Sequence, residues 1–256
     1  MYLIDTHSHI YQPAFDEDTD AMMQRALEAG VKKILLPNID IESVERVHKL
    51  CDAYPEVCYP MMGLHPCDVK ENYKEVLDTL YTNFAKRKYV AVGEIGIDLY
   101  WDKTTLPYQI DAFKIQINWA KELGLPIVIH ARESFDEIFA VLDEMNDDRL
   151  TGVFHCFTGT IERAQKVIGY GGFIMGIGGV LTYEKSGLDK VVADIPMEYL
   201  VLETDSPYLT PKPHRGKRNE SAYTRIVAEK LALVKNISLD EVMRITTENA
   251  ERMFGV

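Results

Sequence analysis

Residues 106–130 read LPYQIDAFKIQINWAKELGLPIVIH, a stretch that contains one helix pattern followed by one strand pattern. Apolar side chains recur at spacings of three and four from Leu106 to Ala120, which predicts one buried face of an amphipathic helix. Gly124 is typical of a helix end, and Pro126 opens a short apolar run that finishes at His130. The stretch therefore predicts a helix and then a buried strand that carries a histidine at its end.

The same alternation runs through the whole chain. The eight predicted strands are Met1–Asp5, Val31–Leu36, Val57–Met62, Tyr89–Gly93, Ile127–His130, Gly152–His155, Phe173–Ile177 and Tyr199–Leu202. Strands this apolar are typical of parallel sheets, which are covered on both faces. Eight strand–helix units predict an α/β fold, a (β/α)8 TIM barrel forming a single domain over residues 1–256. Ser238 and Glu241 form a capping box for an extra C-terminal helix. The alternative is a doubly wound parallel sheet.

The composition of the chain makes some classes of function and location less favoured than others. The chain has 28 Lys and Arg residues against 40 Asp and Glu residues, and the resulting charge of −12 disfavours binding of nucleic acid through a broad basic face. It leaves room for an enzyme that contacts a few phosphates. The start of the chain lacks a secretory-signal pattern, and no run approaches the roughly 18 apolar residues of a membrane span. The four cysteines show no C-x-x-C spacing, so a cytoplasmic location is expected.

A glycine-rich segment at residues 171–179, GGFIMGIGG, invites comparison with a dinucleotide-binding fingerprint. Leu181 stands where the third glycine of that fingerprint belongs. The glycines are therefore expected to allow close backbone approach at the end of the seventh strand.

Five of the seven histidines are predicted at or just beyond strand ends. They are His7, His9, His65, His130 and His155. Glu94 follows the fourth predicted strand, and Asp205 follows the eighth. Because the C-terminal ends of barrel strands converge on one face, these side chains are expected to meet there. Imidazole and carboxylate are common ligands of divalent ions, so the pattern predicts a metal site. His48 is expected on the solvated surface, and His214 lies in a polar loop with no role assigned.

Six motifs follow one another along the chain: DTHSH at 5–9, GLHP at 63–66, GEIGID at 93–98, HARE at 130–133, HCFTG at 155–159 and ETDSPY at 203–208. Together they resemble the TatD family of metal-dependent deoxyribonucleases, within the amidohydrolase-like barrels. The resemblance implies one ion held by His7, His9, Glu94 and Asp205, with Glu94 bridging to a second ion bound by His130 and His155. It also implies Mg²⁺-dependent hydrolysis of DNA, often as a 3′→5′ exonuclease on single strands.

Other residues around this implied site have expected roles. Asp205 is expected to accept a proton from the attacking water, or else only to bind metal. Glu203 precedes it by two residues and is expected to orient the water or a ligand. His65 is expected to contact the scissile phosphate, with a structural role as the alternative.

Two further segments supply candidates for substrate binding. The loop at 211–219, PKPHRGKRN, holds four basic residues and no acid, and the planar guanidinium of Arg215 makes it the predicted phosphate ligand. Tyr100 and Trp101, after the fourth strand, are expected either to stack nucleobases or to pack against the barrel rim.

These observations predict a metal-dependent hydrolase that cleaves DNA with two divalent ions per subunit. Mg²⁺ is the expected metal, and Mn²⁺ or Zn²⁺ are alternatives by ligand softness. The expected substrate contact is a short one with a DNA strand end, with no membrane and no obligate protein partner. Two ions would change the formal charge of −12 to −8. The alternatives are a small-molecule amidohydrolase or lactonase on the same metal barrel, and a metal-dependent binding barrel. A carboxylated lysine ligand, common in amidohydrolases, would need a lysine where Glu94 stands.

Overall fold

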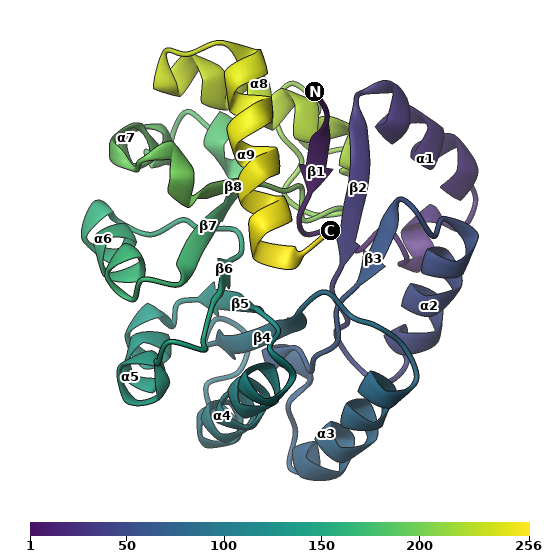
Figure 1. The fold of residues 1–256 in the computed structure, drawn as a ribbon, viewed down its shortest axis with the longest axis vertical. Helices are drawn as coiled ribbons and strands as arrows, with labels where there is room; N and C mark the ends of the chain where they lie inside the picture. Colours follow the sequence, from purple (N-terminus) through teal and green to yellow (C-terminus); the bar gives the residue numbers. More distant parts are fainter.

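The computed structural model describes residues 1–256, in which eight strands alternate with helices around a ring (Figure 1). The strands are β1 (Leu3–Asp5), β2 (Val31–Leu36), β3 (Cys58–Pro60), β4 (Val92–Asp98), β5 (Ile127–Arg132), β6 (Gly152–Phe154), β7 (Phe173–Ile177) and β8 (Leu200–Leu202). The α-helices are α1 (Thr19–Glu28), α2 (Ser43–Ala53), α3 (Tyr73–Tyr81), α4 (Leu106–Leu123), α5 (Phe135–Met145), α6 (Ile161–Gly169), α7 (Leu188–Asp194), α8 (Thr224–Lys235) and α9 (Leu239–Phe254).

The strands close into a parallel barrel. β1 to β3 form one hydrogen-bonded sheet and β4 to β8 form a second, with each strand parallel to the next in sequence. Parallel bridges join the two sheets at both seams, between Met62 and Val92 and between Ser8 and Ser206. All strands therefore end on the same face of the barrel. The prediction of a TIM barrel is confirmed, and the doubly wound alternative is wrong.

Two apolar cores explain why the strands are apolar on both faces. A large cluster of 57 buried residues lies mainly between the strands and the surrounding helices. A smaller cluster of 11 residues, including Ile4, Val128 and Val201, fills the inside of the barrel. Ala250 and Phe254 of α9 belong to this inner cluster, and Figure 1 shows α9 lying across the ring beside β1 and β8. The extra C-terminal helix thus closes the end of the barrel opposite the strand C-termini.

The α4–β5 stretch that predicted the fold has the expected local geometry. The α4 helix runs from Leu106 to Leu123, and Gly124 follows in the left-handed conformation with φ of 64°. The cap of α9 is also as expected, because the Ser238 side chain accepts a hydrogen bond from the Glu241 N–H. No helix combines the length and apolar character that crossing a bilayer requires.

The fourth strand differs from its prediction, because β4 spans Val92–Asp98 rather than Tyr89–Gly93. An apolar run predicts a strand only up to its first polar residue, whereas β4 continues through two buried carboxylates, Glu94 and Asp98. A register shift against β5 between Val92 and Ile95 inserts an extra residue at this point. Glu94 therefore lies within β4 and not after the strand, and β5 continues for two residues beyond the predicted end at His130.

The glycine-rich segment has the role expected of it. A Cβ at Gly176 would collide with a carboxylate oxygen of Glu203, and a Cβ at Gly179 would collide with the carbonyl of Leu209. These glycines allow β7 to approach the end of β8 and the loop that follows it. The approach places Glu203 directly behind the candidate site.

Candidate metal centre

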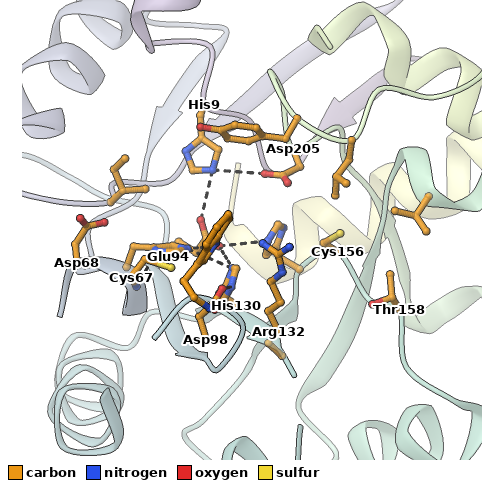
Figure 2. A pocket seen from close by; sticks show the side chains of 18 of the residues that line it. His9, Cys67, Asp68, Glu94, Asp98, His130, Arg132, Cys156, Thr158 and Asp205 are labelled. Atoms are coloured by element: carbon orange, nitrogen blue, oxygen red, sulfur yellow. Dashed lines mark hydrogen bonds and ion pairs between the residues drawn. The ribbon is translucent and has the colours of Figure 1, made fainter. Parts of the chain in front are cut away.

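The predicted strand-end residues converge at the C-terminal face of the barrel. His7 and His9 follow β1, His65 follows β3, Glu94 lies in β4 and His130 in β5, His155 follows β6 and Asp205 follows β8. Figure 2 shows Glu94 between His9 and Asp205 on one side and His130 and Asp98 on the other. Segments separated by almost 200 positions thus build one cluster, as the barrel topology predicts.

Glu94 is the centre of this cluster, and its two oxygens face different histidines. Oε2 lies 3.2 Å from His7 Nε2 and 3.4 Å from His9 Nε2. Oε1 lies 2.8 Å from His130 Nδ1, 3.2 Å from His155 Nε2 and 3.4 Å from His65 Nε2. The carboxylate, only 2% exposed, therefore divides five imidazoles into two groups.

The donor set fits divalent ions. His7 Nε2 and His9 Nε2 are 3.2 Å apart and face the same carboxylate oxygen. Buried lone pairs that converge in this way require a proton or a cation between them. Three groups bring their donor atoms within 4.8 Å of one another: His7–His9–Glu94, His65–Glu94–His130 and His7–His155–Glu203. The second of these groups includes His65, to which the sequence assigns a phosphate contact instead.

Asp205 completes the group around His7 and His9. Its Oδ1 lies 3.8 Å from His7 Nε2 and 3.6 Å from His9 Nε2. Burial raises the pKa of Asp205 to about 6, and the neighbouring histidines oppose the shift. Its backbone is left-handed, with φ of 58°, and turns the chain directly after β8. The geometry allows Asp205 to bind metal or to accept a proton.

The pKa shifts of His7 and Glu94 have the directions that a metal site requires. Burial lowers the pKa of His7 well below its usual value, so this ring is neutral, as a ligand must be. Burial alone raises the pKa of Glu94, but the facing histidines His65, His7 and His155 outweigh it and hold the pKa well below its usual range. Glu94 is therefore ionised, with both oxygens available as ligand atoms.

Glu203 lies behind His155, away from the cavity. Its Oε1 accepts a hydrogen bond of 2.6 Å from the Cys156 N–H and lies 3.2 Å from His155 Nδ1. Burial lowers the pKa of His155, but Glu203 and Glu94 outweigh it and raise the pKa well above its usual value. This position supports the predicted orienting role of Glu203 toward a ligand, and Glu203 is not among the residues that line the cavity.

Asp98 was not singled out from the sequence, although it lies in the quoted GEIGID motif. Its Oδ2 lies 2.8 Å from His130 Nε2, and its Oδ1 accepts hydrogen bonds from the N–H groups of Tyr100 and Trp101. Burial opposes ionisation, but His130 and the two N–H groups hold the pKa of Asp98 at about 2. Asp98 therefore orients His130 in the way that Glu203 orients His155.

Asp5 anchors the seam beneath the site and was also missed. It is fully buried, and its carboxylate accepts hydrogen bonds from the Thr204 N–H at 2.9 Å and from the Thr204 hydroxyl at 2.7 Å. The contact ties the end of β1 to the end of β8, one residue before Asp205. The hydrogen bonds between Asp5 and Thr204 therefore hold His7 and Asp205 at a defined separation.

The cluster forms the floor of a cavity of about 770 Å³. Arg132 is the only lysine or arginine among its lining residues, whereas Asp68, Glu94, Asp98 and Asp205 all line it. Arg132 was not predicted, because the fifth strand was expected to end at His130. The cavity is therefore acidic, with one permanent cation.

The basic loop at 211–219 contributes less to the cavity than expected. Arg215 is not among the lining residues, and its guanidinium carbon lies 4.5 Å from the centre of the Tyr183 ring. Lys212 pairs with Glu184, and Arg218 pairs with Asp18, so two of the four cations are already neutralised. The phosphate-binding role of Arg215 stays a prediction.

The two remaining histidines lie outside the cluster. His48 Nε2 is 2.6 Å from the Tyr89 hydroxyl, and the side chain is partly buried. The expectation of a solvated His48 is therefore wrong, because Tyr89 packs against α2 from a distant part of the sequence. His214 stacks on Tyr223 with ring centroids 4.5 Å apart.

Comparison with known proteins agrees with this geometry. The profile of the family described as TatD related DNase matches residues 4–255. The chain belongs to this family. The hydrolase YabD of Bacillus subtilis, described as an uncharacterised metal-dependent hydrolase, is 37% identical over 99% of both chains. The chain is thus a metal-dependent hydrolase of the TatD family.

Two further relatives extend the comparison. The TatD protein of Salmonella typhimurium, named a 3′-5′ ssDNA/RNA exonuclease, is 33% identical over 99% of both chains. The crystal structure of YjjV, a TatD homologue from Escherichia coli, superposes with a TM-score of 0.93 at 33% identity and covers 99% of this chain and 98% of its own. The TatD-family barrel thus extends over essentially the whole chain.

Proposed function

We propose that this TatD-family hydrolase is a two-metal phosphodiesterase that removes nucleotides from the 3′ end of single-stranded DNA. The observation that carries the proposal is the division of five histidines between the two oxygens of Glu94. A carboxylate with a different set of imidazoles at each oxygen is suited to bridging two ions. The Salmonella relative, named a 3′-5′ ssDNA/RNA exonuclease, supports the substrate class and the polarity.

The proposed ligands follow from the distances. His7, His9, Glu94 and Asp205 would hold one ion, and Glu94 with His130 and His155 would hold the other. His65, 3.4 Å from Glu94 Oε1, is a further ligand or phosphate contact on the second side. Mg²⁺ is the proposed metal, with Mn²⁺ as the closest substitute. When bound, the ions supply an activated water and neutralise charge at phosphorus.

The chain's own residues then have distinct tasks. Asp205 lines the cavity and is placed to take a proton from the water at Oδ1 or Oδ2. Glu203 contacts the His155 ring from behind, and Asp98 contacts the His130 ring at Nε2, the nitrogen that does not face Glu94. The acidic walls of the cavity repel a phosphodiester that has no cation beside it, so productive binding depends on the metal. The charge of −12 disfavours tracking along duplexes and agrees with a brief contact at a strand end.

The direct test uses single-stranded DNA labelled at either end. With Mg²⁺ or Mn²⁺, the protein is expected to release mononucleotides from the 3′ end and to shorten 5′-labelled DNA stepwise. Chelator should abolish both, and His130→Ala should lower the rate by about a thousandfold, since second-ion binding and phosphate stabilisation are lost together. His48→Gln, a histidine outside the cluster, is the matched control and should retain the full rate.

Two results would contradict the proposal. Cleavage that persists in chelator, or in His130→Ala at the control rate, would remove the proposed site from the reaction. Inert DNA combined with hydrolysis of lactones or amides would establish the amidohydrolase alternative in its place.

A further inference from the structure

Two aromatic side chains stand exposed at the mouth of the metal cavity. Trp101 is 71% exposed and Tyr100 is 49% exposed, whereas Trp119, the other tryptophan, is only 8% exposed. Trp101 lines the main cavity and also a small pocket next to it that includes Lys70 and Thr105. The largest apolar side chain is therefore left uncovered beside a polar, acidic site, where it gains nothing from folding.

Arg132 joins these rings to the cavity. Its guanidinium carbon lies 3.7 Å from the centre of the Tyr100 ring and 5.5 Å from that of Trp101. The two rings meet edge to face, with centroids 4.8 Å apart. Arg132 makes no ion pair or side-chain hydrogen bond, although four carboxylates line the same cavity. Figure 2 shows its side chain on the same side of the cavity as His130. The N–H groups of the Arg132 guanidinium therefore remain available to bind an anion.

The backbone that carries the aromatic pair is hydrogen-bonded to a residue that also contacts a candidate metal ligand. Asp98 contacts His130 through Oδ2 and holds the N–H groups of Tyr100 and Trp101 through Oδ1. Arg132 is two residues after His130 on β5 and lies opposite Asp98 in the β4–β5 register. Asp98 and the pairing of β4 with β5 thus connect His130 and Arg132 with the segment that carries both rings.

We propose that Arg132, Tyr100 and Trp101 form a nucleotide subsite next to the scissile bond. The Arg132 guanidinium binds a phosphate of the strand, and the nucleobase of that nucleotide stacks on Trp101 against Tyr100. This inference rests on the proposed function and adds to it a requirement for an unpaired base. A base held in a duplex cannot turn onto the rings, so the subsite selects single-stranded ends.

A binding experiment that does not depend on hydrolysis tests the base contact. The protein with Mg²⁺ is titrated with oligothymidylate whose terminal linkage is a phosphorothioate, and with the same strand carrying an abasic tetrahydrofuran at its 3′ end. Trp101 is the exposed fluorophore, so the base-bearing strand should quench tryptophan fluorescence and bind about tenfold more tightly than the abasic strand. Trp101→Ala should bind both strands equally, and Trp101→Phe should restore most of the difference.

The arginine contact predicts a different pattern. Arg132→Gln should weaken binding of both strands by about tenfold and lower the dependence on salt by about one ion, because a phosphate contact is lost whatever the base. Arg149→Gln, an exposed arginine before β6 that pairs with Asp147, is the matched control and should bind both strands as the wild type does.

Equal affinity of the wild-type protein for base-bearing and abasic strands, with unchanged tryptophan fluorescence, would overturn the base subsite. Unchanged binding and salt dependence in Arg132→Gln would overturn the phosphate contact. These failures differ from failure of the proposed function, because a protein that binds strands through Trp101 but hydrolyses none would contradict the nuclease proposal alone.

Discussion

Glu94 and Gly176 show how single residues define the centre. Glu94 presents one oxygen to His7 and His9 and the other to His65, His130 and His155. Gly176 leaves the space that the Glu203 carboxylate occupies behind His155. Glu94 would bridge the two proposed ions, and the missing side chain at Gly176 leaves room for the carboxylate that contacts His155.

Replacing Glu94 by Gln should remove the bridge while preserving the shape of the side chain. We expect Glu94→Gln to bind at most one ion and to lose activity by at least about a thousandfold, since an amide supplies one neutral oxygen in place of two charged ones. Metal content by elemental analysis and the end-labelled DNA assay measure the two effects. A Glu94→Gln protein with two ions and wild-type activity would be incompatible with the bridging role.

A methyl group at Gly176 should disturb both stability and the centre. Because the added Cβ would overlap the Glu203 carboxylate, Gly176→Ala should lower the free energy of unfolding by about 1–3 kcal/mol and weaken metal binding. Denaturant unfolding and metal titration provide the measurements. Gly169→Ala is the control, because Gly169 ends α6 with no atom within 4 Å of an added Cβ, and it should leave stability the same or slightly higher.

Which residues the sequence predicts depends on where their partners lie. The strand-end histidines were found because alternation and position along the chain mark them. Asp98 and Arg132 were missed, since their importance depends on the length of β4 and β5 and on which charges are paired. Arg215 was favoured because its loop is basic, but the acids that neutralise Lys212 and Arg218 come from segments far away in sequence.

At the scale of elements, an ion-pair network ties the loop after β8 to α1. Asp18, just before α1, accepts hydrogen bonds from Arg218 at 2.7 and 2.8 Å and from Arg25 at 3.0 Å. Arg25 also binds Glu220, which is nearly buried. The network holds the segment that follows Asp205 against the first helix.

Breaking this network should cost stability only where Asp18 is ionised. Its hydrogen bonds to Arg218 hold the pKa of Asp18 well below its usual value, so the contribution is complete above about pH 4 and is lost as the pH falls further. Asp18→Asn should lower the free energy of unfolding by about 1 kcal/mol at pH 7, less in high salt, and approach the wild type at acid pH. Thermal unfolding at several pH values measures the difference, and Asp148→Asn, an exposed acid without an ion pair, is the control. A constant difference at every pH would rule out this account.

The boundaries of elements were harder to predict than their existence. All eight strands lie where apolar runs occur, yet β4 is shifted toward its C-terminus because Glu94 and Asp98 are buried with partners. Burial of a carboxylate depends on charges that other strands supply, and a single strand's sequence does not contain them. The register shift at Val92 and Ile95 is likewise a property of the pair of strands.

At the scale of the whole molecule, the two ends of the barrel differ: one is closed by apolar packing, and the other carries the candidate metal centre. The α9 helix fills the N-terminal end with Ala250 and Phe254, and the acidic cavity occupies the other. Part of the net charge of −12 is concentrated in this cavity, where four carboxylates create an environment suited to cations. Bound metal should consequently stabilise the fold as well as support the reaction.

Metal removal tests this link between charge and stability. At an ion concentration about 100-fold above its dissociation constant, each ion stabilises the native state by about 2.7 kcal/mol. Adding Mg²⁺ or Mn²⁺ to chelated protein should raise Tm by about 10–20 °C when both ions bind, with a much smaller rise in Glu94→Gln. An equal rise in both proteins would indicate non-specific ion binding.

The most direct measurement is anomalous diffraction from crystals of the protein soaked in Mn²⁺. The bridging role predicts two anomalous peaks, one near Glu94 Oε2 with His7, His9 and Asp205, and one near Oε1 with His130 and His155. A single peak, or peaks that do not contact Glu94, would contradict the two-metal centre on which the proposed nuclease depends.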